Sequence, residues 1–282
     1  MTSMLRDMDR NKVYGEAIQL IISHFLSFTG YAPNVLDIGA GTGLLSLLAS
    51  QAGALKVIGC EMFEAMAAIA KEVVHENHRQ HHIDIIPNKS TEISVEEPIA
   101  DILISEILDS TLLGEGVFFS HSDAIQRLLT KECYREDIVD IEERKRWSVP
   151  ICDRVIPHSA VMYATLIESD VINTMQDIHH MRYNNTTPYR DEAAQYCVGD
   201  RRLIPVHWKA LQDRHARELS NATELLSFEF FHTQEDFSQR SETVITVTQD
   251  GRVHGVMLWW KLYLLSSNID PERKCMYTTQ PG

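Results

Sequence analysis

The stretch Val35–Gly43, which reads VLDIGAGTG, decides the fold class of this chain. It starts as a short apolar segment typical of a buried strand and runs directly into three alternate glycines. Residues 44–52 then return to helical character. Glycines at a strand-to-helix turn let the backbone pass close to a ligand without interference from a Cβ atom. The stretch therefore predicts the first strand and ligand-binding turn of a Rossmann-like sheet.

Strand-like and helical segments alternate on both sides of this stretch. Helical spacing of apolar residues covers 11–28, 63–77 and 122–130, whereas 55–60, 83–86 and 101–105 are strand-like. Strands separated by helices predict a mainly parallel sheet covered on both faces. From about Val155 the pattern changes to strands linked by irregular chain, at 160–167, 225–230, 243–248 and 255–265.

These patterns predict an α/β chain with two domains. Residues 1–153 are expected to form the Rossmann-like domain, including its N-terminal helix. Residues 154–282 are expected to form a β-rich, barrel-like domain. The charged segment 131–146 is expected to be a solvated helix or connector between them.

Composition and charge narrow the function classes. The chain has 282 residues, and its 44% hydrophobic content is ordinary for a soluble globular protein. A formal net charge of −14 argues against direct binding of nucleic acid and suits a cationic partner. The sequence contains no apolar run long enough for a membrane span and no regular spacing of metal ligands, so neither a membrane nor a metal is expected. Five cysteines without close pairs predict reduced thiols.

The glycine turn favours a nucleoside ligand. The dinucleotide fingerprint G-x-G-x-x-G is broken at Leu44, whereas the G-x-G-x-G form suits a methyltransferase sheet. Glu61 ends the second predicted strand, 18 residues after Gly43. From that position its carboxylate can accept hydrogen bonds from both ribose hydroxyls.

An acidic loop, Ser105–Gly116, follows the apolar strand that ends at residue 105. Gly114 and Gly116 bracket Glu115 and permit a tight return that would place Glu106 and Glu115 together. Two carboxylates held together are costly unless a cation joins them, and a planar guanidinium matches them best. By fixing the guanidinium charge, they would leave lone-pair density on the nitrogen that faces a methyl donor. The pair predicts an arginine substrate.

These motifs resemble the protein arginine methyltransferases, and Met4–Asn11 is similar to the family's N-terminal segment. The resemblance implies S-adenosylmethionine as cofactor and no metal. It implies Glu106 and Glu115 as catalytic residues and Asp109 as a substrate-binding residue. In the family, the position that matches Arg10 grips the cofactor carboxylate. The implied cofactor-binding residues are Arg10, Asp37, Gly39, Gly41, Glu61, Met62, Ser90 and Thr91.

The resemblance also gives expectations about the methylated product, the binding partners and the extent of the barrel. The chain is most similar to a member that forms monomethylarginine, although a related member that forms symmetric dimethylarginine also carries an acid at the place of Asp109. Arg-rich substrates such as histones or RGG-type RNA-binding proteins, a homodimer, and cytoplasmic and nuclear localisation are expected. The barrel is expected to be incomplete at its C-terminal end, because the family's late Thr-His-Trp loop has no counterpart before Gly282.

Two other function classes stay open. One is a catalytically impaired scaffold that binds the cofactor. The other is methyl transfer to a small molecule, which would leave the paired glutamates without a role.

Overall fold

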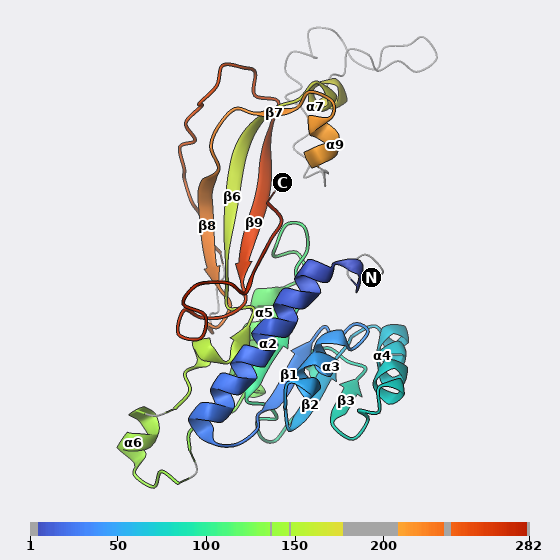
Figure 1. Cartoon of the computed structure of the whole chain (residues 1–282), viewed down its shortest axis with the longest axis vertical. Helices are drawn as coiled ribbons and strands as arrows, with labels where there is room; N and C mark the ends of the chain where they lie inside the picture. Colours follow the sequence, from blue (N-terminus) through green and yellow to red (C-terminus); the bar gives the residue numbers. More distant parts are fainter. Residues whose placement is uncertain (1–4, 136, 147, 177–207, 234–237, 281–282) are drawn as a thin grey trace. The chain divides into compact units, whose positions relative to one another are not determined.

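The computed structural model describes residues 5–135, 137–146, 148–176, 208–233 and 238–280 (Figure 1). The chain divides into two compact units that are discontinuous in sequence. Unit 1 comprises Met1–Val161, Ser227–Gln239 and Lys261–Thr278. Unit 2 comprises Met162–Leu226, Arg240–Trp260 and Thr279–Gly282.

A five-stranded sheet with the order β3-β2-β1-β4-β5 forms the centre of unit 1. Its strands are β1 (Asn34–Ile38), β2 (Lys56–Cys60), β3 (Ile83–Ile86), β4 (Ile102–Ser105) and β5 (Val155–Ile156). Each neighbouring pair is parallel. The strands are short and rich in Val, Ile and Leu, as expected when both faces of a parallel sheet are covered.

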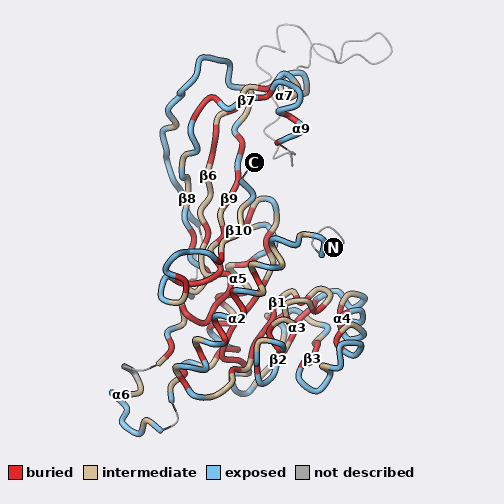
Figure 2. Tube along the Cα trace, viewed as in Figure 1, coloured by how far each residue is buried: buried red, intermediate tan, exposed pale blue. Residues whose placement is uncertain are grey.

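Helices precede and connect the strands of this sheet. They are α2 (Met8–Thr29), α3 (Leu44–Gln51), α4 (Glu64–Glu76), α5 (Val117–Arg127) and α6 (Ile141–Arg146), with 3-10 turns η1 (Ser90–Glu92) and η2 (Ile151–Asp153). Helix α2 begins at an Asp7 cap, ends at Gly30, and runs beside α3 (Figure 1). Helix α4 buries only Ala67, Ala70 and Val74, a stripe at helical spacing, and its outer face is exposed (Figure 2).

The second sheet contains three longer strands, β6, β8 and β9, whose residues are divided between the two units. It has the order β10-β9-β6-β7, and β8 pairs with β6. The strands are β6 (Ser159–Glu168), β7 (Arg217–Glu218), β8 (Thr223–Glu229), β9 (Gly255–Tyr263) and β10 (Met276–Thr278). The pairs β6–β7 and β9–β10 are antiparallel. Unit 2 also contains α7 (Asp170–Gln176) and α9 (Trp208–Gln212), and its core includes Ile167, Trp208 and Met257.

The predicted fold class is confirmed, because a Rossmann-like parallel sheet is followed by a β-rich antiparallel part. One predicted strand is wrong. Residues 243–248 make a single bridge, between Val247 and Ser220, and form no strand among the described residues. All six residues are β-branched, which is typical of a strand, but five of the six are exposed, so burial does not favour one face. The expected boundary at 153/154 remains a prediction, although β5 lies after it and joins the parallel sheet.

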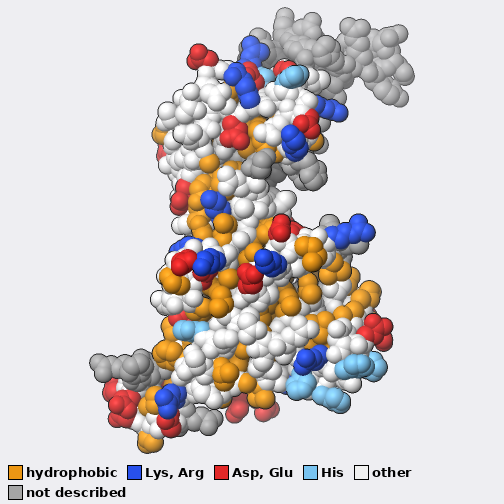
Figure 3. Space-filling model, in the orientation of Figure 1, with side chains coloured by type: hydrophobic (Ala, Val, Ile, Leu, Met, Phe, Trp, Pro, Cys, Tyr) orange, Lys and Arg blue, Asp and Glu red, His pale blue; other side chains and the backbone are white. Residues whose placement is uncertain are grey.

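The surface carries charges of both signs. On the face shown in Figure 3, acidic and basic side chains are interspersed. Within the described ranges, no helix is both long and apolar enough to cross a membrane, and no group of three or more His, Cys, Asp and Glu side chains could hold a metal ion. Four of the cysteines are free, and Cys197 lies outside the described residues.

Candidate active site

The carboxyl edge of the parallel sheet gathers most of the predicted site residues. The chain passes from β1 outward to β2 and β3, then returns to β4 on the other side of β1, so the strand order reverses between β1 and β4. Ligands bind at such switch points. Ile38 is in register with both Cys60 and Ser105. Gly39, Glu61 and Glu106 come directly after these three residues, so they follow their strands at the same position along the sheet edge.

The glycine loop approaches the acidic loop closely. Gly39 has a φ of +76°, and a Cβ atom there would overlap Cγ2 of Ile107. Gly41 donates its backbone N–H to Oε2 of Glu61 at 2.9 Å, and Phe63 donates to Oε1 at 2.9 Å. The buried Glu61 carboxylate is thus fixed by backbone groups on both sides, and each oxygen keeps a further lone pair for a ligand hydroxyl.

Asp37 is fully buried at the end of β1. Ser46 donates its hydroxyl to Oδ2 of Asp37 at 2.6 Å, whereas Oδ1 has no hydrogen-bond partner among the described residues. Burial raises the pKa of Asp37 to about 6, and the Ser46 hydrogen bond opposes that shift. A buried acceptor without a partner is costly, so this oxygen is well placed to bind a donor group of a ligand.

Three further predicted cofactor residues follow the neighbouring strands. Met62 comes directly after Glu61 and is 52% exposed, so its side chain is available at the surface of the edge. Ser90 is buried and Thr91 is half-buried, and both lie in η1 after β3. Arg127 fixes this turn by donating to the carbonyl oxygen of Ser90 at 3.1 Å.

Asp109 organises the acidic loop from within. Its carboxylate accepts hydrogen bonds from the backbone N–H groups of Thr111 (3.0 Å) and Gly114 (3.1 Å) and from the Thr111 hydroxyl. A Cβ atom at Gly114 would overlap the Asp109 carboxylate, so the loop needs glycine there. These contacts of the Asp109 carboxylate all lie within its own loop.

Glu106 is held by a guanidinium. Its Oε2 lies 3.1 Å from Nη1 of Arg10, and the two side chains are only 14% and 12% exposed. Burial raises the pKa of Glu106 to about 7, Arg10 opposes this rise, and the charge of Glu115 adds to it. Glu115 is itself exposed and makes no hydrogen bond or ion pair with the described part of the chain. The two acids are therefore near enough to interact.

The position of Arg10 depends on contacts that sequence reasoning missed. Asp7 accepts the backbone N–H of Arg10 at 3.0 Å and the Tyr277 hydroxyl at 2.8 Å. Tyr14, one turn after Arg10, donates its hydroxyl to the carbonyl oxygen of Ser105 at 3.3 Å. Burial raises the pKa of Tyr277 to about 12, so its hydroxyl keeps its proton at neutral pH.

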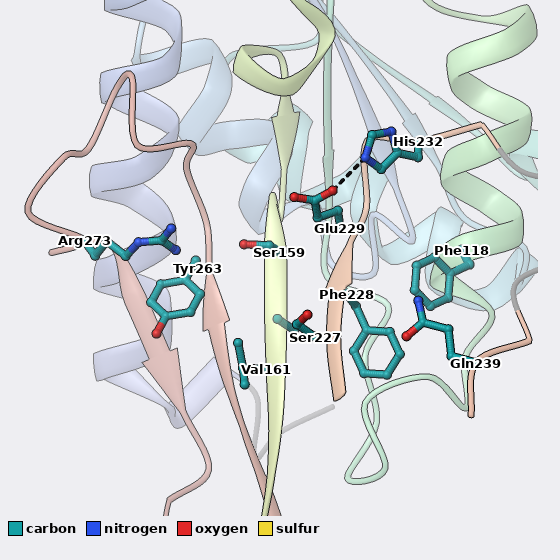
Figure 4. Close-up of a pocket in the computed structure, with 11 residues that line it drawn as sticks. Phe118, Ser159, Val161, Ser227, Phe228, Glu229, His232, Gln239, Tyr263 and Arg273 are labelled. Atoms are coloured by element: carbon teal, nitrogen blue, oxygen red, sulfur yellow. Dashed lines mark hydrogen bonds and ion pairs between the residues drawn. The ribbon is translucent and has the colours of Figure 1, made fainter. Parts of the chain in front are cut away.

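A separate cavity of about 450 Å³ lies in unit 1 (Figure 4). Phe118 of α5, two residues after the acidic loop, contributes to its wall. On one side Glu229 pairs with His232 at 2.7 Å, and on the other the guanidinium of Arg273 lies 4.3 Å from the centre of the Tyr263 ring. The cavity is therefore lined by a paired carboxylate on one side and a guanidinium on the other.

Comparisons with known proteins agree with the resemblance seen in the motifs. A family model described as ribosomal protein L11 methyltransferase (PrmA) matches residues 19–115. Protein arginine N-methyltransferase 7 of Oryza sativa subsp. japonica is 30% identical over 294 residues, which covers 99% of this chain and 36% of that protein. The protein of the same name from Danio rerio is 28% identical over 284 residues, with 99% and 38% covered.

Two solved structures share the fold. The Trypanosoma brucei PRMT1 enzyme-prozyme heterotetrameric complex with AdoHcy aligns with a TM-score of 0.67 and 24% identity, covering 92% of this chain and 71% of that one. Protein arginine methyltransferase 10 of Arabidopsis thaliana, in an open conformation, aligns with a TM-score of 0.65 and 21% identity, covering 93% and 71%. The expected similarity to the protein arginine methyltransferases, and to member 7 among them, is confirmed. The chain spans 36% of the length of its rice relative.

Proposed function

We propose that this chain is a protein arginine N-methyltransferase that transfers a methyl group from S-adenosylmethionine to the guanidinium of a protein arginine. The observation that carries the proposal is the Arg10–Glu106 ion pair. A half-buried carboxylate at the switch point already binds a guanidinium, at 3.1 Å, and the negative charge of a second acid, Glu115, acts on it. The relatives named protein arginine N-methyltransferase 7 support the same activity.

The residues at the sheet edge fit the proposed cofactor. Oδ1 of Asp37 has no partner in the described part of the chain, the turn at Gly39 and Gly41 lets a ligand come close to the backbone, and Glu61 is fixed by backbone groups. These features match a ligand with amino and ribose hydroxyl groups. Met62, Ser90, Thr91 and Arg10 complete the proposed binding set. When bound, S-adenosylmethionine supplies an electrophilic methyl group on a sulfonium. The structural neighbour from Trypanosoma brucei is a complex with AdoHcy, which supports this choice.

In the proposed mechanism, Glu106 and Glu115 orient the substrate guanidinium. A guanidinium has five donors in a rigid fork, so two carboxylates fix its plane and hold its charge on one part of the fork. The remaining nitrogen then faces the methyl group. Most of the rate gain comes from positioning and preorganised charge. With its pKa raised to about 7, Glu106 is also suited to take up the proton that the product releases.

We propose monomethylarginine as product, because the similarity to member 7 supports it. The symmetric dimethyl product is the alternative, and chromatographic separation of hydrolysed product distinguishes them. Arg-rich proteins such as histones or RGG-type RNA-binding proteins are the proposed substrates, in the cytoplasm and nucleus. A homodimer is proposed as well. The heterotetrameric state named for one neighbour is consistent with assembly in this fold.

Incubation with methyl-labelled S-adenosylmethionine and an Arg-rich protein tests the activity. We expect label on arginine at catalytic enzyme concentration. If the Arg-rich protein carries no label even when enzyme and substrate are present in equal amounts, the proposal is refuted. Label that appears on a small molecule in substrate profiling, and not on protein, would favour the small-molecule alternative.

A second candidate is a scaffold that binds the cofactor without turnover. One observation favours it: Arg10 already pairs with Oε2 of Glu106, one of the two carboxylate oxygens that a substrate guanidinium would use. Calorimetry that detects S-adenosylhomocysteine binding, together with no methyl transfer, would support this candidate.

A further inference from the structure

A hydrogen bond joins the first residue of the acidic loop to the helix that follows the loop. Ser105 is the last residue of β4 and directly precedes Glu106, whereas His121 lies in the helix that begins after Gly116. The Ser105 hydroxyl oxygen lies 2.7 Å from Nε2 of His121. Both residues are 0% exposed. The bond spans 16 residues of chain and closes the segment that carries Glu106 and Glu115.

The partners of His121 determine which nitrogen carries its proton. Nδ1 lies 3.0 Å from the carbonyl oxygen of Phe230, which can only accept, so Nδ1 is the donor. Nε2 is then free to accept the Ser105 hydroxyl proton when the ring is neutral. Burial lowers the pKa of His121 to about 4, so the neutral form holds throughout the physiological range. The neutral ring protonated at Nδ1 therefore satisfies both partners: it donates to the Phe230 carbonyl oxygen and accepts from the Ser105 hydroxyl.

Ser105 is also fixed through its backbone. Tyr14 donates to its carbonyl oxygen at 3.3 Å, and Arg10, four residues earlier on α2, pairs with Glu106. Two residues on one face of α2 therefore contact two consecutive residues at the end of β4. The Ser105 hydroxyl makes its hydrogen bond to His121, so the end of β4 is also linked to α5.

We propose that His121 is a positioning residue for methyl transfer: through Ser105 it closes the acidic loop and sets the separation of the Glu106 and Glu115 carboxylates. This inference rests on the proposed function of those two acids. Buried imidazole and hydroxyl groups cost free energy unless both are paired. A core position that needed only packing would be filled more cheaply by an apolar side chain. The Ser105–His121 hydrogen bond closes the segment that carries Glu106 and Glu115, and so it can fix the distance between their carboxylates.

The test compares Ser105→Ala and His121→Asn with Thr29→Ala as matched control. Thr29 is 3% exposed and donates its hydroxyl to the carbonyl oxygen of Phe25 at 2.9 Å, so its loss removes a buried hydroxyl hydrogen bond outside the site. His121→Gln is the conservative variant, because its amide oxygen can reach toward Ser105. Each protein is checked for folding by circular dichroism and thermal unfolding before assay.

We expect Ser105→Ala and His121→Asn to lower kcat with an Arg-rich peptide on the order of 10²-fold, since small displacements of catalytic groups have effects of that size. The Kd for S-adenosylhomocysteine should change by less than about 3-fold, because most of the proposed cofactor contacts follow β1, β2 and β3 and not β4. Thr29→Ala should keep wild-type kcat, and His121→Gln should recover part of the loss. Equal kcat losses in Thr29→Ala and Ser105→Ala, or none in any variant, would overturn the proposal.

Hydrogen exchange separates this inference from the proposed function. The backbone amides of 111–116 should exchange faster in Ser105→Ala and His121→Asn than in wild type and Thr29→Ala. This readout needs no turnover, so it remains decisive if the wild-type protein is inactive and the proposed activity fails. Unchanged exchange in both loop variants would show that the bond does not close the loop. Should His121→Asn fail to fold, His121→Gln and Ser105→Ala carry the same comparison.

Discussion

Glu106 combines partial burial, which raises its pKa, with an ion pair to Arg10. The sequence predicted its place at the end of an apolar strand, and in the structure it lies directly after β4, near a second acid. Its partner, Arg10, was expected to reach for the cofactor, a role that remains a prediction. The ion pair between them could not be read from the sequence, because it depends on how α2 crosses the end of β4.

The raised pKa of Glu106 predicts a pH-dependent activity. The group binds a substrate cation only as a carboxylate, while the guanidinium stays charged at every pH tested. With the pKa of Glu106 at about 7, kcat/KM should fall about tenfold per pH unit below that value and level off above it. Assays in a constant-ionic-strength buffer series check this. A flat profile between about pH 5.5 and 8 would contradict the assigned role.

His121 shows the limit of sequence reasoning at the residue scale. One histidine within a helical segment is usually a polar surface residue or a satisfied core residue, and no spacing pattern distinguishes it. Only the contacts with Ser105 and Phe230, 16 and 109 residues away, reveal that it links α5 to the start of the acidic loop.

At the scale of elements, the turn from β1 to α3 carries the clearest sequence signal. The three alternate glycines of this turn all have positive φ values, between +57° and +84°. The strand predicted at 83–86 agrees with β3. A short apolar run between a helix and a polar loop has few other interpretations. The strand predicted at 243–248 is wrong, since a run of β-branched residues without a buried face does not by itself make a strand.

Replacing Gly39 tests whether this turn is built for close approach. Gly39→Ala adds a Cβ at positive φ and against Ile107, so it should lower the free energy of unfolding by more than about 2 kcal/mol and weaken cofactor binding. Gly30→Ala is the matched control, because its φ of +83° is similar and nothing lies within 4 Å of its Cβ. It should cost only about 1 kcal/mol. Urea unfolding compares them, and equal costs would argue against the close contact.

At the scale of the whole molecule, the N-terminal helix is tied to the last strand. The Asp7–Tyr277 hydrogen bond spans 270 residues, and nothing in the local sequence around either residue predicts it. Tyr277→Phe should lower the free energy of unfolding by about 1 kcal/mol, the usual net value of one hydrogen bond. It should also raise the KM for substrate through a less fixed Arg10. An unchanged unfolding midpoint would show that the bond contributes nothing.

The net charge of −14 predicts electrostatic steering of cationic substrates. Association of an Arg-rich peptide should slow roughly tenfold when salt rises from about 0.05 to about 0.5 M, because screening shortens the range of the attraction. Stopped-flow fluorescence of a labelled peptide measures this rate. A citrulline-containing peptide of equal length serves as control and should bind at a rate nearly independent of salt.

The paired acids of the acidic loop are central to the proposed function, and one comparison tests them directly. Methyl transfer to an Arg-rich peptide and the Kd for S-adenosylhomocysteine are measured on the same preparations of wild type, Glu106→Gln and Glu115→Gln. Each variant should lose at least about 10²-fold in kcat, as expected when one preorganised charge contact is removed, and should keep its cofactor affinity within about 3-fold. Wild-type turnover in either variant would contradict the guanidinium site.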